Sequence, residues 1–372
     1  MIGVSRKPLI DYDTHRKRVA ESPRRPVTRT LPIASQCKHF GKLLDRTKCG
    51  QEVYSCRKHG TCSHQPQTCK DGMQLCDRCN DYQLSATWRR IRIDEKTHGV
   101  SRGGVRLNAS CIPWKDGYLL AYRSCWGNAD VEIVTLDKDY RETMQPRPLR
   151  LSSPLALDSR EDPRLFIHRG KPHVWYNGYN LGRNKVTVHY AELDPVKWKV
   201  VSKHYPKLPF GGDWEKNHAY FDRGGDLHAV YSINPHRVYQ VRGNDVAEDW
   251  TTHYTPPGTA REYGEMRGGA SPVLFNHAFY NFFHYMTDAH GHRLYSVGVY
   301  TFDTDPPFRV RRMTMQPIDV AEVNRKYLID VLFPVSAFIE GDSWVVTMGV
   351  HDEYSEVRYY PIDFIERSLV PV

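Results

Sequence analysis

The sequence has no run of about 18 consecutive apolar residues, the length that a membrane-spanning helix needs. Residues 1–19 carry charges but lack the apolar core of a secretory signal. Cysteine is scarce after residue 79, where only Cys111 and Cys125 remain, and we expect both to be small buried hydrophobic side chains rather than ligands. These absences predict a soluble, cytoplasmic protein without a membrane span.

Net charge is nearly absent from most of the chain. Residues 1–83 hold 16 Lys and Arg against 8 Asp and Glu, whereas the remaining residues hold 36 against 35. In residues 1–35 the basic side chains lie among Pro, Ser and Thr without a hydrophobic period, which predicts a flexible basic arm. Such an arm could bind an anionic partner (nucleic acid, an anionic glycan or a membrane surface), or it could be a solvated tail with no specific partner.

Residues 36–83 form a Cys/His-rich segment. Seven of the nine cysteines lie there, and the segment has too few large apolar side chains to build a core unaided. Cys76 and Cys79 have CxxC spacing, and Cys56 and His59 have the same spacing, so each pair can approach one tetrahedral ion. We predict a structural zinc site, with an iron–sulfur cluster and disulfides or free thiols as the alternatives. The candidate ligands are Cys37, Cys49, Cys56, His59, Cys62, Cys69, Cys76 and Cys79.

Residues 84–372 contain a unit that recurs five times. Each unit has a short mixed strand, a tight turn and an aromatic-rich strand, and the turns at positions 117, 170, 225, 277 and 341 are 53, 55, 52 and 64 residues apart. β-Branched and aromatic strands repeated at this period predict an all-β fold, a five-bladed β-propeller. With 40% hydrophobic and 12% aromatic residues, the chain can build a large core. A β-sandwich is the alternative, although its turns need not keep a common period.

Polar residues recur at equivalent positions of these units. Eight or nine residues before the first three turn markers lie Asn108, Asp162 and Asn217. In a propeller such strand ends converge on one mouth of the central channel, so we expect the side chains to share a pocket. The alternative for each single residue is a polar cap on a turn. The positions six to eight residues after the markers hold Arg123, Asn177, Ser232, His284 and Gly349, with Asp352 just beyond.

The run EDPRLF at 161–166 is the strongest chemical signal. Asp162 precedes a proline, which favours extended backbone, and Arg164 lies two positions on, on the same face of a strand. We expect Glu161 to point to the opposite face and to support the site. An acid ringed by cations suits glycosyl transfer to or from phosphate, and Tyr and Trp offer stacking faces for sugars. Further candidates are Lys216 (alternatively a surface lysine), His236 (alternatively a packed neutral histidine), Arg237, Arg267, His284 and Asp352.

An ordered set of motifs resembles the five-bladed propellers of glycoside hydrolase family 130 and its glycosyltransferase-like relatives. The motifs are EDPRLF (161–166), WEKNHAYFDRGGDLHAVYSINPHRV (214–238), RGGASPVLF (267–275), FFH (282–284), VLFPVSAF (331–338) and GVHDEYS (349–355), within about residues 100–368. The family contains mannoside phosphorylases and mannosidases, whose chemistry needs no metal.

The resemblance implies particular roles for the matching residues. Asp162 would be the general acid of an inverting reaction, acting through a sugar hydroxyl in the phosphorylases. Asn108, Lys216 and Asp352 would bind the glycosyl unit. The residues that would lie near the sugar or an anionic group are Arg164, His236, Arg237 and His284.

Two departures from the family pattern bear on the direction of the reaction. The usual Asn-Pro-Ser reads Asn-Ala-Ser at 108–110, and the phosphate-binding Tyr-His has only a loose counterpart at 234–237. We therefore expect transfer from a sugar phosphate or nucleotide sugar to a glycan or other acceptor ahead of phosphorolysis. A glycoside hydrolase of the same fold and a non-catalytic propeller that binds glycan or nucleic acid are the alternatives.

Overall fold

The computed structural model describes residues 40–46, 52–56, 60–64, 90–93, 106–124, 130–151, 157–258, 260–289, 292–321 and 329–372. In these residues nearly all regular structure is β, and the one α-helix is α3 (Ile362–Ser368). No helix in this part of the chain is long and apolar enough to cross a membrane. A three-stranded antiparallel sheet is formed by β1 (Phe40–Arg46), β2 (Glu52–Cys56) and β3 (Gly60–His64).

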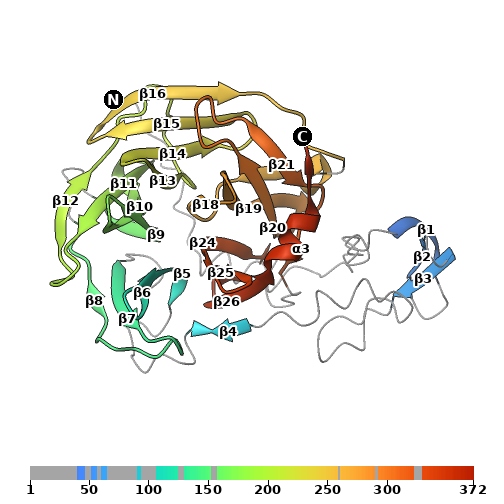
Figure 1. The fold of residues 1–372 in the computed structure, drawn as a ribbon, viewed down its shortest axis with the longest axis horizontal. Coiled ribbons are helices and arrows are strands. Elements are labelled where there is room, and N and C mark those ends of the chain that lie inside the picture. Colours follow the sequence, from blue (N-terminus) through green and yellow to red (C-terminus); the bar gives the residue numbers. More distant parts are fainter. Residues whose placement is uncertain are drawn as a thin grey trace, which may run out of the picture.

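The other sheets surround a common centre as a β-propeller (Figure 1). Four of them are four-stranded and antiparallel. The first contains β5 (Leu107–Trp114), β6 (Gly117–Arg123), β7 (Val131–Leu136) and β8 (Arg147–Pro148), and the second β9 (Ser159–His168), β10 (Lys171–Asn180), β11 (Lys185–Leu193) and β12 (Val200–His204). The third contains β13 (Ala219–Arg223), β14 (Asp226–Ser232), β15 (His236–Arg242) and β16 (Asp245–Thr252), and the last β24 (Leu332–Glu340), β25 (Ser343–Val350), β26 (Tyr354–Pro361) and β4 (Arg90–Arg92).

The fourth sequence unit forms a larger, eight-stranded sheet. Its strands are β17 (Glu265–Arg267), β18 (Val273–Phe275), β19 (Ala278–Ala289), β20 (His292–Phe302), β21 (Val310–Thr314), β22 (Asp319–Val320), β23 (Ile329–Asp330) and β27 (Leu369–Pro371). The all-β propeller prediction is confirmed, but the prediction of five blades is corrected. The described residues form four regular blades, because the fourth unit recruits short strands from segments outside the repeat.

Two-residue turns connect the first two strands of each unit, at the positions that the sequence period marks. In the hairpin of β13 and β14, Arg223 pairs with Asp226, so the loop consists of Gly224 and Gly225. Their φ angles of 59° and 87° lie in the left-handed region, which glycine adopts without steric cost and which matches the twist of a hairpin. The turn markers are therefore confirmed as hairpin turns.

The two ends of the described propeller are tied into neighbouring sheets. Strand β4 pairs with β26 and completes the last blade, and β27 pairs with β21 of the eight-stranded sheet. Ile93 follows β4 and is fully buried, in a cluster with Tyr122 of the first blade and Val345 of the last. A segment that precedes the propeller in sequence thus fills the interface between its first and last blades.

The predictions for the N-terminal segments fall largely outside the described residues. The basic arm at 1–35 and most of the proposed zinc ligands lie there, and no side chains are described for Cys56 and Cys62 in β2 and β3. The zinc site stays a prediction. Cys111 is buried as predicted, and burial raises the pKa of its thiol, which fits a packing role. Cys125 lies outside the described residues.

Replacement of Ile93 by alanine tests the closure of the ring. Ile93→Ala removes a fully buried side chain from the interface of the first and last blades and should lower the free energy of unfolding by about 2–5 kcal/mol. Val201→Ala on β12, where the side chain is 59% exposed, is the control and should cost less than about 1 kcal/mol. Urea unfolding followed by tryptophan fluorescence measures both free energies of unfolding. Equal losses of stability in the two variants would contradict a role for Ile93 in joining the first and last blades.

Candidate active site

Three equivalent polar residues share an unusual backbone conformation. Asn108, Asp162 and Asn217 have φ angles of 48°, 51° and 61°, in the left-handed region that Asn and Asp tolerate better than most residues. Asn108 and Asp162 also lie at register shifts between the first and second strands of their blades, where two residues face one on the partner strand. Such β-bulges turn side chains away from the regular alternation of a strand. The equivalence predicted from the period is therefore visible in the backbone.

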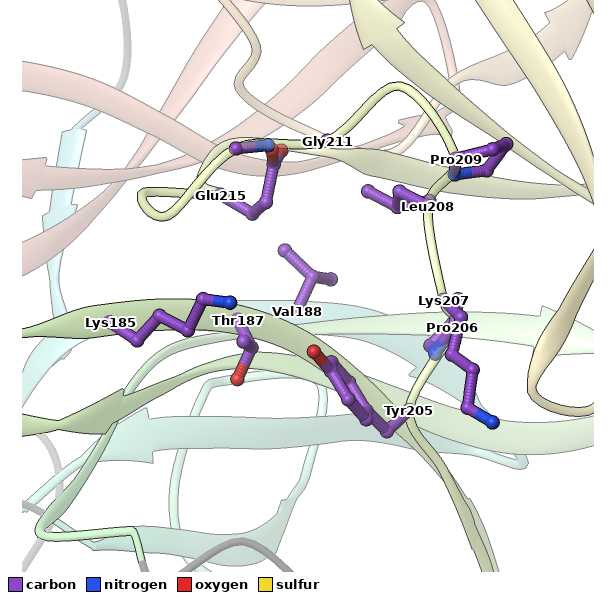
Figure 2. Close-up of a pocket in the computed structure, with 11 residues that line it drawn as sticks. Lys185, Thr187, Val188, Tyr205, Pro206, Lys207, Leu208, Pro209, Gly211 and Glu215 are labelled. Atoms are coloured by element: carbon purple, nitrogen blue, oxygen red, sulfur yellow. The ribbon is translucent and has the colours of Figure 1, made fainter. Parts of the chain in front are cut away.

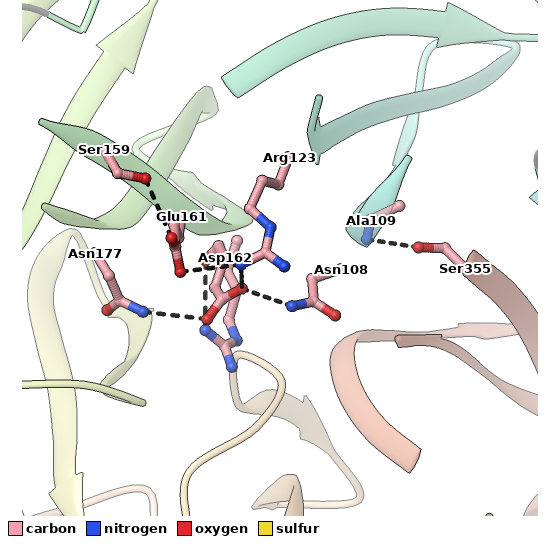
Figure 3. A network of polar contacts seen from close by, with 9 residues as sticks. Asn108, Ala109, Arg123, Ser159, Glu161, Asp162, Asn177 and Ser355 are labelled. Carbon is pink, nitrogen blue, oxygen red and sulfur yellow. Dashed lines mark hydrogen bonds and ion pairs between the residues drawn. The ribbon is translucent and has the colours of Figure 1, made fainter. Parts of the chain in front are cut away.

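Asp162 is the centre of a network of polar contacts (Figure 3). Asn108 of the first blade donates a hydrogen bond of 2.6 Å to its Oδ1, and Asn177 donates one of 3.3 Å to its Oδ2. A guanidinium nitrogen of Arg123 lies 3.7 Å from Oδ1. The carboxylate is thus fixed by two amide donors and one cation, with only 15% of the side chain exposed.

Glu161 lies in the same network, which corrects its predicted orientation. Its Oε2 accepts a hydrogen bond of 2.9 Å from the same Arg123 nitrogen, and its Oε1 accepts one of 3.1 Å from the hydroxyl of Ser159. In a regular strand Glu161 and Asp162 would point to opposite faces, but the bulge between them and Arg164 brings both carboxylates to Arg123. The supporting role expected for Glu161 is consistent with these contacts.

Arg164 supplies a second guanidinium behind Asp162. The side chain is fully buried, its carbon Cζ lies 4.4 Å from the ring centre of Trp175 and 4.7 Å from that of Phe333, and Nη1 donates to the Asp162 carbonyl at 3.5 Å. Burial lowers the pKa of Arg164 to about 10, with Asp162 opposing the shift. Arg164 therefore remains charged at neutral pH and is held by aromatic faces.

Lys216 and Asp352 complete the charged group. The charge of Lys216 lowers the pKa of Asp162, and the charge of Asp162 raises the pKa of Asp352. Lys216, Arg123 and Arg164 are three cations, and Glu161, Asp162 and Asp352 are three carboxylates. The group that we call the Asp162 cluster consists of these six residues and carries no formal net charge when all are ionised.

The three carboxyl groups respond differently to this environment. Burial opposes ionisation of Asp162, but Arg123, Arg164, Asn108 and Lys216 favour the carboxylate more strongly and hold its pKa below the ordinary value. Burial raises the pKa of Glu161 and of Asp352, and the negative charge of Asp162 adds to both shifts. Asp162 is therefore the strongest acid of the three.

Gly349 provides the space that Asn108 needs. A β-carbon at this position would lie 2.0 Å from Oδ1 of Asn108, so any larger residue would displace the amide that binds Asp162. Gly349, one of the positions predicted to contribute to the site, thus supports the site because it has no side chain.

His284 and Arg267 lie together beside this cluster. They are paired across β17 and β19, and the ring of His284 contacts that of Phe333 with centroids 4.8 Å apart. Burial lowers the pKa of His284 well below its ordinary value, and Arg267 and Arg164 lower it further. His284 is therefore neutral, while Arg267 forms an ion pair of 2.5 Å with Glu265.

Two predicted candidates have other partners. His236 is fully buried, with Nδ1 2.9 Å from the Phe308 carbonyl and Nε2 3.3 Å from the Tyr300 hydroxyl. Burial lowers its pKa to about 4. Arg237 forms an ion pair of 2.6 Å with Asp249. Within the described residues, no hydrogen bond or ion pair joins either side chain to the Asp162 cluster, so the packed alternative describes His236 better than the predicted role at the site.

A cavity of about 420 Å³ lies elsewhere in the second blade (Figure 2). Lys185, Thr187 and Val188 of β11 form one wall, and the segment 205–215 forms the other. None of the predicted site residues lines it. Glu215 lines the cavity, and the next residue, Lys216, belongs to the Asp162 cluster, so one segment contributes a side chain to each.

Serine hydroxyls, which no sequence motif indicates, connect the inner strands around the site. The backbone N–H of Leu165 donates to the hydroxyl of Ser110 at 2.8 Å, and that of Cys111 donates to Ser336 at 2.8 Å. Ser355 accepts from the N–H of Ala109 at 3.0 Å (Figure 3). These bonds satisfy inner-strand donors across blade boundaries and fix the neighbours of Asn108 and Asp162.

Replacement of Arg123 tests the electrostatic control of Asp162. Arg123→Gln removes a cation that lowers the pKa of Asp162, so this pKa should rise by about one unit or more. Arg160→Gln, whose guanidinium faces Asp130 at 3.3 Å, is the control and should leave it unchanged. Carboxyl ¹³C NMR titration measures the value, with Asp162→Asn to assign the signal. An unchanged titration in Arg123→Gln would show that other groups control Asp162.

Comparisons with known proteins agree on the fold. No protein-family model and no curated protein sequence matches this chain. A β-1,2-mannobiose phosphorylase from Listeria innocua superposes with a TM-score of 0.56 at 14% identity, covering 71% of this chain and 91% of that one. A structure described with the GH130 family of mannoside phosphorylases, which contains hydrolases that target β-1,2 mannosidic linkages in Candida mannan, gives 0.54 at 12% identity, covering 70% and 85%. A glycosyl hydrolase from Bacteroides ovatus gives 0.51 at 13% identity, covering 70% and 85%. This chain is thus similar in fold to these propellers.

Proposed function

We propose that this protein is a carbohydrate-active enzyme that transfers a glycosyl unit, with Asp162 as the group that exchanges the proton. The donor is a sugar phosphate or a nucleotide sugar, and the acceptor is a hydroxyl of a glycan or another compound. The observation that carries the proposal is the ionised Asp162 carboxylate, bound by two amides beside two guanidinium groups. The similarity in fold to family 130 structures and the matching motifs support it.

In the synthetic direction Asp162 acts as a base. The acceptor hydroxyl gives its proton to the carboxylate while its oxygen forms the bond to the anomeric carbon. The bond from that carbon to the phosphate oxygen breaks, and phosphate or the nucleoside phosphate leaves with the electron pair. A carboxylate whose pKa lies below its ordinary value is already ionised for this step, and Arg123, Arg164 and Lys216 offer positive charge to the leaving group.

In the reverse direction Asp162 must first hold a proton. The six charged residues of the Asp162 cluster balance, so an added phosphate anion makes the site net negative. The added anion offsets the cations that lower the pKa of Asp162 and therefore raises that pKa. Binding of phosphate would thus favour the protonated Asp162, which gives its proton to the glycosidic oxygen as the bond from that oxygen to the anomeric carbon breaks. A phosphate oxygen forms the new bond to the anomeric carbon from the opposite side, and this single displacement inverts the configuration.

Hydrolysis is the second candidate, and Asp352 favours it. An inverting hydrolase uses one carboxyl group as acid and a second as the base that activates water. Burial and the charge of Asp162 raise the pKa of Asp352, which is the direction that a general acid requires, and the ionised Asp162 would then be the base. Identification of the products separates the candidates, because hydrolysis releases a free sugar and transfer consumes or releases phosphate.

Replacement of Asp162 tests the proposal. Asp162→Asn keeps the size and the hydrogen-bonding capacity of the side chain but cannot accept a proton, so turnover should fall by about 10²-fold or more. Asp116→Asn, the same change at an exposed turn of the first blade, should retain full activity. A product screen with sugar 1-phosphates and nucleotide sugars against a panel of acceptors provides the assay. Near-normal turnover by folded Asp162→Asn would sink the assignment.

Removal of residues 1–83 separates an enzyme from a binding protein. The cut leaves β4 and Ile93 in place, so the propeller should fold. A catalytic propeller should keep its turnover on a small acceptor, whereas a protein that works through its basic arm should lose its function. Absence of turnover in the full-length protein, together with loss of glycan or nucleic-acid binding in the folded, shortened protein, would favour the non-catalytic alternative.

A further inference from the structure

An exposed aromatic side chain lies next to the Asp162 cluster on a firmly held segment. Trp214 is 56% exposed, the most exposed aromatic side chain among the large exposed hydrophobic residues of the described chain. Its ring meets that of Tyr179 edge to face, with centroids 6.4 Å apart and planes at 84°. The two rings at right angles form a corner, and more than half of Trp214 is exposed.

Both rings of this corner lie near residues of the Asp162 cluster. The ammonium of Lys216 lies 4.7 Å from the ring centre of Tyr179 and 5.7 Å from that of Trp214. Tyr179 lies two residues after Asn177 on β10, on the same strand face, and it contributes to the ionisation of Arg123. The aromatic corner is therefore continuous with the groups that hold Asp162.

The segment that presents Trp214 is fixed by backbone and side-chain bonds. It pairs with β11 in a parallel bridge, in which the N–H of Val186 donates to the Asp213 carbonyl at 2.8 Å and the N–H of Glu215 donates to the Val186 carbonyl at 3.0 Å. Glu215 points inward, where its carboxylate contacts Nε2 of His218 at 3.0 Å. Because side chains alternate in an extended segment, Trp214 and Lys216 face the other way, toward Tyr179.

We propose that Trp214 and Tyr179 form the binding platform for a pyranose ring of the acceptor glycan. A pyranose has an apolar C–H face that packs on an aromatic ring and an edge of hydroxyl groups, which Lys216 can bind as a donor. The perpendicular rings fit this shape, whereas a flat nucleobase could stack on only one of them. The inference rests on the proposed function, since it assigns the acceptor side of the same site.

Binding to an inactive protein tests the platform separately from catalysis. In the Asp162→Asn background, β-1,2-mannobiose, cellobiose, maltose and a nucleoside diphosphate sugar are titrated by calorimetry. At least one disaccharide should bind, Trp214→Ala should weaken that binding about tenfold, and Trp214→Phe should restore most of it. In the otherwise wild-type enzyme, Trp214→Ala should raise the KM for the acceptor and leave kcat and the KM for the donor nearly unchanged.

Three outcomes would overturn the platform: no binding of any disaccharide to the parent, equal binding with and without the Trp214 ring, or an effect confined to the nucleotide sugar. The last would place a nucleobase on Trp214 instead. These outcomes are distinct from failure of the proposed function, which shows as undiminished turnover by Asp162→Asn. The exposed Val201→Ala serves as the control for nonspecific surface effects.

Discussion

The site depends on a backbone constraint: the left-handed conformation at the start of the inner strands. At Asn108 and Asp162 this conformation coincides with a bulge, and it brings side chains from two blades within 2.6 Å of each other. A non-glycine residue in this region costs on the order of 1 kcal/mol, so the surrounding structure must hold it. Serine hydroxyls bound across the blade boundaries and the empty space at Gly349 provide that support.

Charge balance is the second constraint, and it follows from the first. Regular strands would send Glu161 and Asp162 to opposite faces and would leave Arg123 with one carboxylate. The bulge brings both to the same guanidinium. Burial and the charge of Asp162 raise the pKa of Glu161, whereas the cations and Asn108 outweigh burial at Asp162 and lower its pKa. In the proposed reaction, an anion that binds beside the two buried guanidinium groups would raise the pKa of Asp162 and so favour its protonation.

The features that keep the repeat period were predictable from the sequence. The hairpin turns and the equivalence of Asn108, Asp162 and Asn217 follow from residue spacing, because a propeller repeats its geometry with its sequence. The bulge was not predictable, since one extra residue reverses the alternation on which the orientation of Glu161 was inferred. His236 contacts the carbonyl of Phe308 and Arg237 forms an ion pair with Asp249, and no sequence motif specifies either partner. The eight-stranded sheet draws β22, β23 and β27 from segments without the period.

The anchoring of segment 211–217 explains why the exposed side chain of Trp214 is suited to ligand binding. A tryptophan on a mobile loop would lose rotamer and backbone freedom on binding a ligand, and that loss would offset the contact. Trp214 belongs instead to a bridge with β11, and the buried Glu215 next to it fixes which face the ring presents. Folding of the protein has therefore already removed most of the backbone freedom that Trp214 would otherwise lose on binding a ligand. The same anchoring places Lys216 beside both the aromatic corner and Asp162, so a sugar bound on Trp214 would lie next to the carboxylate to which we assign the proton transfer.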